Sequence, residues 1–269
     1  ALQAMAAGTH VVIDKPMCLT VAEADALLAA QRRAGVLLSV FHNRRWDWDF
    51  LTIKHVLDQG WIGRPYLFET AILRYRAPRG WRGETSAGGG IIFDWGAHLI
   101  DQALQLVPGP VASVSCEIQR RRWGADAGSY VRLLLRFASD VLYSIEIGNL
   151  AAVGKPRWYV LGEEGGLLKE GLDPQEPAML RGNIESATEA PNERTRVWST
   201  RDGLHVESVV ESIRGDWTSY YRNVCDALEG RAELAVRPEE ARRALTIFEA
   251  ALASAATHES VRPSDERGD

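Results

Sequence analysis

The sequence predicts a short α/β unit at its N-terminus, followed by a larger α+β domain built on an antiparallel sheet. Residues 10–44 contain two apolar, β-branched runs separated by a helical stretch, the order typical of parallel strands joined by a crossover helix. From residue 66 onward, long segments alternate apolar and polar residues, and this period of two indicates strands that bury one face. We therefore place residues 1–44 in the first domain and residues 45–269 in the second.

Local signals define the elements of the first domain. The apolar run at 10–14 predicts a buried strand, and Pro16 ends it because proline cannot donate a hydrogen bond to the ladder. Thr20 and Glu23 have the spacing of a capping box, which opens an Ala- and Leu-rich helix. The second apolar run, at 36–41, completes a β-α-β unit.

The second domain is predicted to combine a sheet, helices on one of its faces and a long loop. The expected strands occupy residues 66–76, 111–119, 129–137, 141–148 and 157–161. The expected helices occupy residues 47–59, 91–106, 215–229 and 238–256. The stretch 171–203 has little periodicity, which indicates a loop. We expect the other face of the sheet to be open, to carry Val, Leu, Ile and Tyr side chains, and to pair with a second subunit.

The composition agrees with an intracellular globular enzyme. The net charge of −5 and the pI near 5.8 give no electrostatic support to nucleic-acid or anionic-membrane partners. Three cysteines without a C-x-x-C pair indicate neither a disulfide framework nor a thiolate metal site, and they fit a reducing compartment. The six histidines show no metal-binding spacing, and no apolar run is long enough to span a membrane. We predict no metal and no membrane partner.

The most informative motif is GGGIIFDWGAHLIDQ at residues 88–102. Asp94, His98 and Asp101 follow one another at spacings of four and three, which places them on one helical face. Such a face puts a titratable base beside a carboxylate able to orient it. A buried histidine satisfied by the aspartate one turn earlier fits the same pattern.

A second motif, Asp14-Lys15-Pro16, follows the first predicted strand. Lys15 is thus placed at the carboxyl end of a strand, the edge at which open α/β sheets bind their ligands. A lysine there can hydrogen-bond a substrate oxygen and favour its negative charge, as a dehydrogenase or an aldolase-like enzyme requires. The alternative is a lysine on a surface loop.

Together the two motifs resemble those of the glucose-fructose oxidoreductase/inositol dehydrogenase (Gfo/Idh/MocA) family of NAD(P)-dependent enzymes. The Glu-Lys-Pro motif of the family is met by Asp14-Lys15-Pro16, and its glycine run before Asp-x-x-x-His is met by residues 88–90, Asp94 and His98. The stretches most similar to the branch that contains NADP-dependent scyllo-inositol dehydrogenases are 42–63, 96–106 and 171–176.

The resemblance implies an oxidoreductase that moves hydride between a nicotinamide and a secondary alcohol of a cyclitol, polyol or sugar. It assigns His98 as the base, Asp94 as the group that orients its ring, and Lys15 as the donor to the same substrate oxygen. Asp101 would either bond substrate hydroxyls or cap a neighbouring group. The residues placed near NAD or NADP, with NADP slightly favoured, are Asp14, Lys15, Pro16, Asn43, Arg44, Trp81 and Arg82.

The resemblance also implies that residues 1–44 form the last third of a Rossmann domain. The sequence has no strand followed by G-x-G-x-x-G and an acidic partner, so relative to the family it would lack on the order of a hundred N-terminal residues. By itself the chain is then expected to bind NAD(P) negligibly and to associate through unpaired strand edges. Two alternatives remain: a catalytically silent binding or dimerisation protein of the same fold, and an oxidoreductase acting on an imine or enone.

Overall fold

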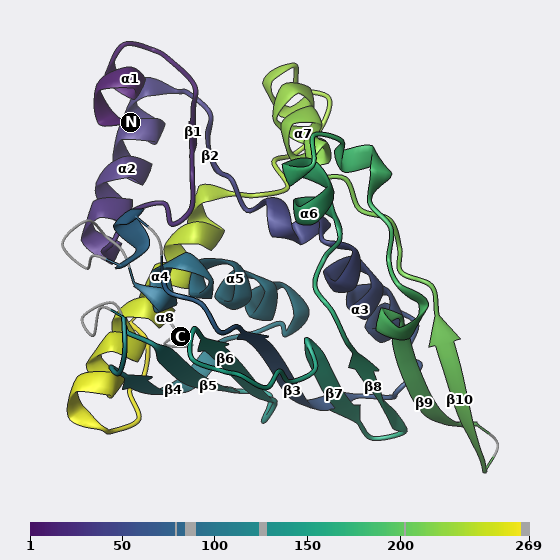
Figure 1. The fold of residues 1–269 in the computed structure, drawn as a ribbon. Helices are drawn as coiled ribbons and strands as arrows, with labels where there is room; N and C mark the ends of the chain where they lie inside the picture. The colour runs from purple at the N-terminus through teal and green to yellow at the C-terminus, as the bar shows by residue number, and fades with distance from the viewer. Residues whose placement is uncertain (79, 84–89, 124–127, 202, 265–269) are drawn as a thin grey trace.

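The computed structural model describes residues 1–78, 80–83, 90–123, 128–201 and 203–264, with the backbone alone at 81, 82 and 201. Figure 1 shows two parts: a two-stranded sheet near the N-terminus, and an eight-stranded sheet with helices on one face. The predicted fold class, an α/β unit followed by a sheet domain, is confirmed.

The N-terminal part is a parallel β-α-β unit. Its elements are α1 (Leu2–Ala6), β1 (Val11–Ile13), α2 (Val21–Ala34) and β2 (Leu38–Val40). The two strands pair in parallel, with Val11 opposite Leu38. The predicted capping box is present: the Thr20 hydroxyl accepts from the Glu23 amide at 3.2 Å, and the Glu23 carboxylate accepts from the Thr20 amide at 3.1 Å.

The four predicted helices of the second part are present, one of them with a break, and α6 is an additional helix. They are α3 (Trp48–Asp58), α4 (Ile91–Asp94), α5 (Gly96–Leu106), α6 (Gln175–Leu180), α7 (Thr218–Leu228) and α8 (Pro238–Thr257). Short 3₁₀ turns lie at η1 (Asn43–Trp46), η2 (Gly80–Gly83), η5 (Ile184–Ser186) and η6 (Pro191–Glu193). The helix expected at 91–106 is interrupted at Trp95, between α4 and α5. This break matters for the site described below.

The large sheet is mixed, whereas a purely antiparallel sheet was expected. Its strands are β3 (Pro65–Leu73), β4 (Val111–Gln119), β5 (Tyr130–Phe137), β6 (Leu142–Gly148), β7 (Trp158–Gly162), β8 (Gly165–Lys169), β9 (Thr195–Arg201) and β10 (Leu204–Val210), in the order β10-β9-β8-β7-β3-β6-β5-β4. One pair, β3 with β6, is parallel. After β3 the chain crosses over through α4 and α5 to the far edge and returns by β4, β5 and β6, which leaves β6 pointing the same way as β3.

The stretch expected to be a long loop, 171–203, contains regular structure. It holds α6, two 3₁₀ turns and β9, and β9 pairs with both β8 and β10. Neither β8 nor β10 was anticipated. The residues of β10 are exposed almost throughout, so this edge strand shows no alternation of buried and exposed positions from which a strand could be predicted.

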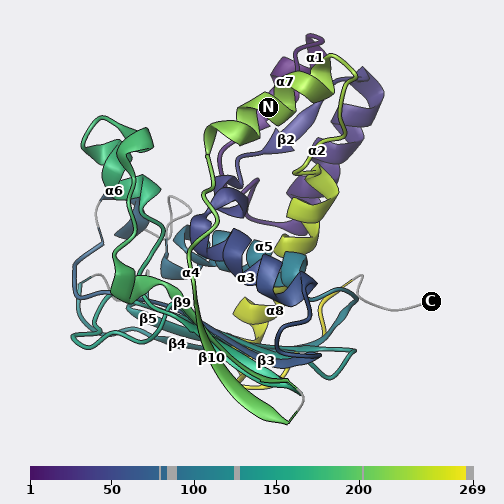
Figure 2. The same cartoon turned by 90° about the vertical axis from the view of Figure 1, so that its right-hand side faces the viewer.

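The C-terminal helix α8 joins the two parts of the molecule. It packs against β4 on one side and against α2 and β2 on the other (Figure 2). The Glu249 carboxylate of α8 accepts from the Val21 amide at 2.8 Å, and Arg242 contacts Asp25 of α2 at 2.5 Å. Apolar residues from both parts belong to one continuous core, so the covalent boundary near residue 44 is not a boundary in packing.

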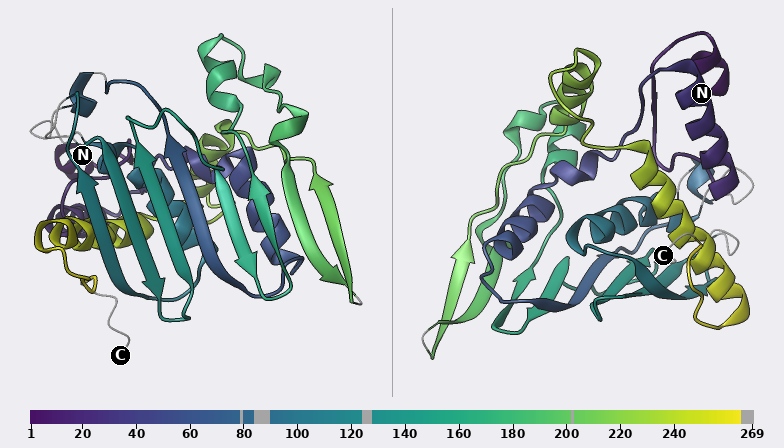
Figure 3. Two further views of the ribbon diagram at one scale, coloured as in Figure 1. Left: turned by 60° about the horizontal axis from the view of Figure 1, so that its bottom comes forward. Right: turned by 180° about the vertical axis from the view of Figure 1, so that it is seen from behind.

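The outer face of the large sheet is uncovered, as the left panel of Figure 3 shows. Leu134, Tyr159 and Trp198 are about one-third exposed there, at 36%, 37% and 37%. Arg132 and Arg136 of β5 alternate with Leu134 on the same face. The face is therefore a mixture of apolar and charged side chains, and not the apolar surface expected. Among the described residues, no helix has the length and apolar character required to cross a lipid bilayer.

Candidate active site

A pocket of about 520 Å³ lies where the two parts of the molecule meet. The carboxyl ends of β1 and β2 open into it, as do the break between α4 and α5 and the ends of β3 and β6. The residues that line it are Asp14, Lys15, Phe41, Asn43, Arg44, Arg74, Arg76, Ala77, Pro78, Ile91, Asp94, Trp95, His98, Asn149, Glu176, Met179, Leu180 and Trp217. The structure thus brings Lys15, Asp94 and His98 into one pocket.

Lys15 holds the helix break in place. Its Nζ donates to the backbone carbonyl of Asp94 at 2.7 Å and to Asp94 Oδ1 at 3.1 Å. In an unbroken helix that carbonyl would accept from the amide of residue 98, but the His98 amide donates to the Trp95 carbonyl instead, at 3.1 Å. Burial lowers the pKa of Lys15, while the Asp94 carboxylate acts to raise it.

His98 is 6% exposed and borders the pocket. Its pKa is well below the usual value, first because of burial and then because of the charges of Lys15 and Arg44. Nδ1 is buried and has no hydrogen-bond partner. Because that nitrogen is enclosed, Nε2 is the atom left to reach a bound molecule. The ring is therefore a neutral imidazole at neutral pH, able to accept a proton.

The partner of Asp94 differs from the one expected. The sequence pattern placed its carboxylate against the His98 ring, yet Oδ1 bonds Lys15, and no hydrogen bond between Asp94 and His98 occurs in the described structure. The reason is the break at Trp95, which removes the regular four-residue spacing. Asp94 thus positions Lys15.

Asp101 lies outside the pocket lining. It is 3% exposed, and Arg45 binds both of its carboxylate oxygens, with Nε to Oδ2 at 2.8 Å and Nη2 to Oδ1 at 2.6 Å. Of the two roles considered from the sequence, a bond to a neighbouring group is the one present. Contact with substrate hydroxyls would require this buried bidentate pair to open, so the structure argues against that role.

The remaining predicted site residues differ in whether they line the pocket. Asp14, Asn43 and Arg44 line the pocket, whereas Pro16 is not among the lining residues. The Arg44 guanidinium bonds Asp47 at 3.1 Å and Glu176 at 2.7 Å, and it lies 4.3 Å from the centroid of the Trp95 ring. Four predicted positions lie outside what the structure describes: the side chains of Trp81 and Arg82, and the residues Gly88 and Gly89.

The sequence did not single out the pocket residues that follow β3 and β6. Arg74 comes directly after β3, and Asn149 comes directly after β6. They meet because these two strands are parallel, so their carboxyl ends share one edge of the sheet. If these two strands were antiparallel, as expected, Arg74 and Asn149 would lie at opposite ends of the strand pair. The unanticipated helix α6 supplies further lining residues, including Glu176 and Met179.

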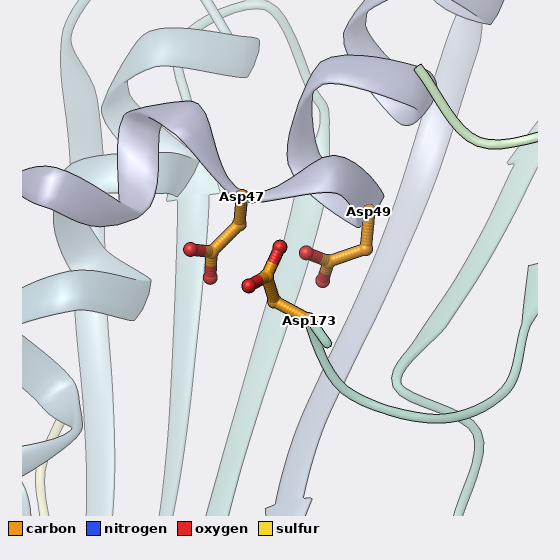
Figure 4. Close-up of side chains that lie close together, drawn as sticks. All are labelled: Asp47, Asp49 and Asp173. Atoms are coloured by element: carbon orange, nitrogen blue, oxygen red, sulfur yellow. The ribbon is translucent and has the colours of Figure 1, made fainter. Parts of the chain in front are cut away.

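Arg44 also bonds a buried carboxylate cluster, which is formed by Asp47, Asp49 and Asp173 (Figure 4). One oxygen from each lies within 4.8 Å of the others. Five of the six oxygens accept hydrogen bonds or ion pairs, from Arg44, Trp217, Trp158, Arg157, Trp48 and Gln175. The exception is Asp49 Oδ1, which is buried without a partner.

Burial sets the protonation of this cluster. It raises the pKa of Asp173 to about 6, with the Asp49 charge acting in the same direction. It raises the pKa of Asp47 well above the usual range, against the opposing effect of Arg44. Since N–H groups already occupy nearly all the oxygens, the donor set is that of a hydrogen-bonded structural cluster.

Family models match both parts of the chain. Residues 1–42 match an oxidoreductase family described as an NAD-binding Rossmann fold, and residues 50–168 match the GFO/IDH/MocA C-terminal domain. A scyllo-inositol 2-dehydrogenase (NADP⁺), IolW of Bacillus subtilis, is 32% identical over 92% of this chain and 70% of its own length. The chain belongs to the Gfo/Idh/MocA family. This confirms the resemblance inferred from the two motifs.

Other relatives are described as oxidoreductases. An uncharacterized oxidoreductase of Escherichia coli, YdgJ, is 35% identical over 94% of this chain and 73% of its own length. Among solved structures, one described as a candidate oxidoreductase, yvaA of Bacillus subtilis, has a TM-score of 0.91 at 30% identity and covers 97% of this chain and 76% of that one. The N-terminal part of the present chain is thus Rossmann-like, with the sheet domain following it.

Proposed function

We propose that this protein is an NAD(P)-dependent oxidoreductase that transfers hydride between a nicotinamide and a secondary alcohol of a cyclitol, polyol or sugar. The observation that carries the proposal is the meeting of Lys15, Asp94 and His98 in one pocket at the carboxyl ends of β1 and β2. The relative IolW, by its name an NADP-dependent scyllo-inositol dehydrogenase, favours a cyclitol and gives weak support to NADP.

The residues present fit the nicotinamide end of such a cofactor. The pocket lies at the carboxyl ends of two parallel strands, where α/β sheets receive nucleotides, and Asp14, Asn43 and Arg44 form its lining there. Arg44 and Lys15 add positive charge to this part of the lining, which suits a cofactor that carries phosphates. When bound, the nicotinamide supplies the hydride acceptor or donor.

The chain's own residues would handle the proton. His98, neutral because of burial and neighbouring cations, accepts the hydroxyl proton at Nε2 as the alcohol is oxidised. The Lys15 ammonium donates a hydrogen bond to the same oxygen and favours its developing negative charge. Asp94 keeps Lys15 in position through two hydrogen bonds and favours its charged form.

A substrate panel tests this function directly. The chain is tested as part of a protein that also carries the nucleotide-binding residues implied by the family resemblance. That protein is mixed with NAD⁺ or NADP⁺ and with scyllo-inositol, myo-inositol and simple polyols and sugars, and formation of reduced nicotinamide is followed by absorbance. We expect turnover of at least one cyclitol, polyol or sugar, abolished in Lys15→Ala. A panel that is inert with both cofactors, while an imine or enone is reduced, would overturn the proposal.

The proposal includes a homo-oligomer formed through the outer face of the sheet. A groove of about 470 Å³ on this face is lined in part by Tyr159, Leu161, Trp198 and Val206. Large apolar side chains exposed together are unusual on a monomer. Sedimentation at micromolar concentration should show a dimer or a larger oligomer. Trp198→Glu should shift the equilibrium between oligomer and monomer toward the monomer. A monomeric parent protein would contradict this part of the proposal.

A further inference from the structure

Arg74 is fixed in the pocket wall by its backbone. Its amide donates to the Gly148 carbonyl at 2.7 Å, and its own carbonyl accepts from the Ala151 amide at 3.0 Å, so the residue is tied to the chain that follows β6. The side chain is half-buried and lines the same pocket as Lys15 and His98. Its guanidinium carbon lies 4.8 Å from the centroid of the Trp95 ring.

Three other arginines at or near the pocket have carboxylate partners. Arg44 bonds Asp47 and Glu176, Arg45 bonds Asp101 and Glu240, and Arg157 bonds Asp49. In the part of the chain that the structure describes, Arg74 contacts the Trp95 ring but has no side-chain hydrogen bond and no ion pair. A guanidinium withdrawn from water in this way lacks the compensation that the others receive.

The surroundings of Arg74 are positively charged. Its pKa is lowered, first by burial and next by the charge of the neighbouring Arg76. The two carboxylates near enough to oppose this, Glu176 and Asp94, are already engaged by Arg44 and Lys15. Among the described contacts, no carboxylate of the pocket forms an ion pair with the Arg74 guanidinium.

Two further donors share this wall of the pocket. Arg76 is exposed, and its backbone amide donates to the Asn149 carbonyl at 3.0 Å, which keeps the two residues side by side. Both line the pocket. Among the described contacts, neither the Arg76 guanidinium nor the Asn149 amide group has a carboxylate partner. Together with Arg74 they offer several N–H groups facing one space.

We propose that Arg74, assisted by Arg76 and Asn149, binds an oxyanion on the substrate: the carboxylate of a sugar acid or the phosphate of a sugar phosphate. The guanidinium fork matches two oxygens of either group, and a half-buried setting strengthens the bond. This inference rests on the proposed function, because it names the class of polyol that the pocket accepts. A neutral polyol would leave Arg74 unpaired and is bound less tightly.

Equilibrium binding tests this without turnover. Quenching of tryptophan fluorescence, with Trp95 beside the site, is titrated with D-glucuronate, D-glucose 6-phosphate and D-glucose. We expect at least one of the two anions to bind more tightly than D-glucose, and the tighter anion identifies the source of the oxyanion. Arg74→Gln should lower the affinity for that anion about tenfold to a hundredfold and leave the affinity for D-glucose nearly unchanged.

Two control variants separate charge from fold. Arg64→Gln removes an exposed guanidinium just before β3, at the opposite end of the strand from Arg74, and should change no affinity. Arg74→Lys keeps the charge but loses the fork, so its affinity for the anion should lie between those of the parent and Arg74→Gln.

The outcomes distinguish this inference from the proposed function. Equal affinity for D-glucose and both anions, or equal weakening of all three by Arg74→Gln, would overturn the oxyanion site even if polyols are oxidised. Anion binding that depends on Arg74, in a protein that oxidises no polyol with either cofactor, would uphold the site and overturn the proposed function.

Discussion

Two groups of titratable side chains are linked by Arg44, and they differ in how their hydrogen bonds are satisfied. The carboxylate cluster of Asp47, Asp49 and Asp173 is enclosed, and nearly all its oxygens accept from fixed donors (Figure 4). The pocket group of Lys15, Asp94 and His98 opens to a cavity, and His98 keeps an unpartnered nitrogen. Arg44 touches both, since it bonds Asp47 and lines the pocket.

The comparison indicates where chemistry is possible. A side chain whose hydrogen bonds are all made inside the protein can stabilise a fold, but it has no bond left for a substrate. Polar side chains that line a cavity have the opposite property, because they can still contact a bound molecule. We therefore expect substitutions in the pocket group to change the rate of reaction, and substitutions in the carboxylate cluster to change the free energy of unfolding.

His98→Ala should show the largest effect on rate. Loss of a general base is expected to lower kcat about a hundredfold to ten-thousandfold, with a smaller change in substrate affinity. The melting temperature is measured alongside, because removing a ring that is 6% exposed also leaves a cavity. Steady-state kinetics at neutral pH measure this, with His258→Ala as the exposed control. Near-normal turnover by His98→Ala would remove it from the role of base.

Asp49→Ala should lower the free energy of unfolding and leave the rate of reaction nearly unchanged. The substitution leaves Arg157, 3% exposed, without the carboxylate that its Nε contacts at 3.0 Å. An uncompensated buried charge is expected to cost about 3–5 kcal/mol of unfolding free energy. Urea denaturation measures the loss, and kcat of the folded fraction should stay near that of the parent protein.

Asp58→Ala is the matched control for this prediction. It lies on the same helix, α3, but in an exposed pair with Lys54 at 2.8 Å, so its removal should cost less than about 0.5 kcal/mol. If Asp49→Ala were as mild as Asp58→Ala, the carboxylate cluster would not have the structural role that the comparison assigns to it.

The sequence predicted the elements of the pocket group better than those of the carboxylate cluster. Lys15 and His98 were found because each lies in a local pattern: a strand end, and a helix after a glycine run. Asp49 and Asp173 lie on segments far apart in the sequence, in a helix and in a stretch predicted to be a loop. Only the folded chain brings them together.

The errors have a common physical origin in long-range pairing. Local alternation identified β3 and β6 as strands, but the direction of each pair depends on the crossover between them, so the parallel pair and the position of Arg74 were missed. The partner of Asp94 was wrong for a related reason. A lysine 79 residues away takes its carbonyl and breaks the helix that the spacing predicted.

The stability of the protein should depend on the protonation of Asp173. Its folded pKa is raised from 3.8 to about 6, chiefly by burial, so the unfolded chain loses this proton at lower pH than the folded chain. Stability from this group is therefore present at low pH and is lost as pH rises from about 3.8 to about 6. The free energy of unfolding is measured for the parent protein and for Asp173→Asn at several pH values in this range. The difference between the two should change by about 1–3 kcal/mol across the range. A difference independent of pH would show that Asp173 does not titrate in this window.

Asp94→Asn should have the smallest effect and should test the link between Lys15 and its carboxylate. The backbone bond from Lys15 Nζ to the Asp94 carbonyl remains, so the lysine stays in place and kcat should fall only about tenfold. The charge that raises the pKa of Lys15 is gone, so burial lowers that pKa further. Because Lys15 acts in its protonated form, activity is lost as pH rises through its pKa, and the alkaline limb of the kcat profile should move to lower pH. If the acid limb moved instead, Asp94 would act on His98, as the sequence pattern first indicated, and the pairing in the structure would not be the one used in the reaction.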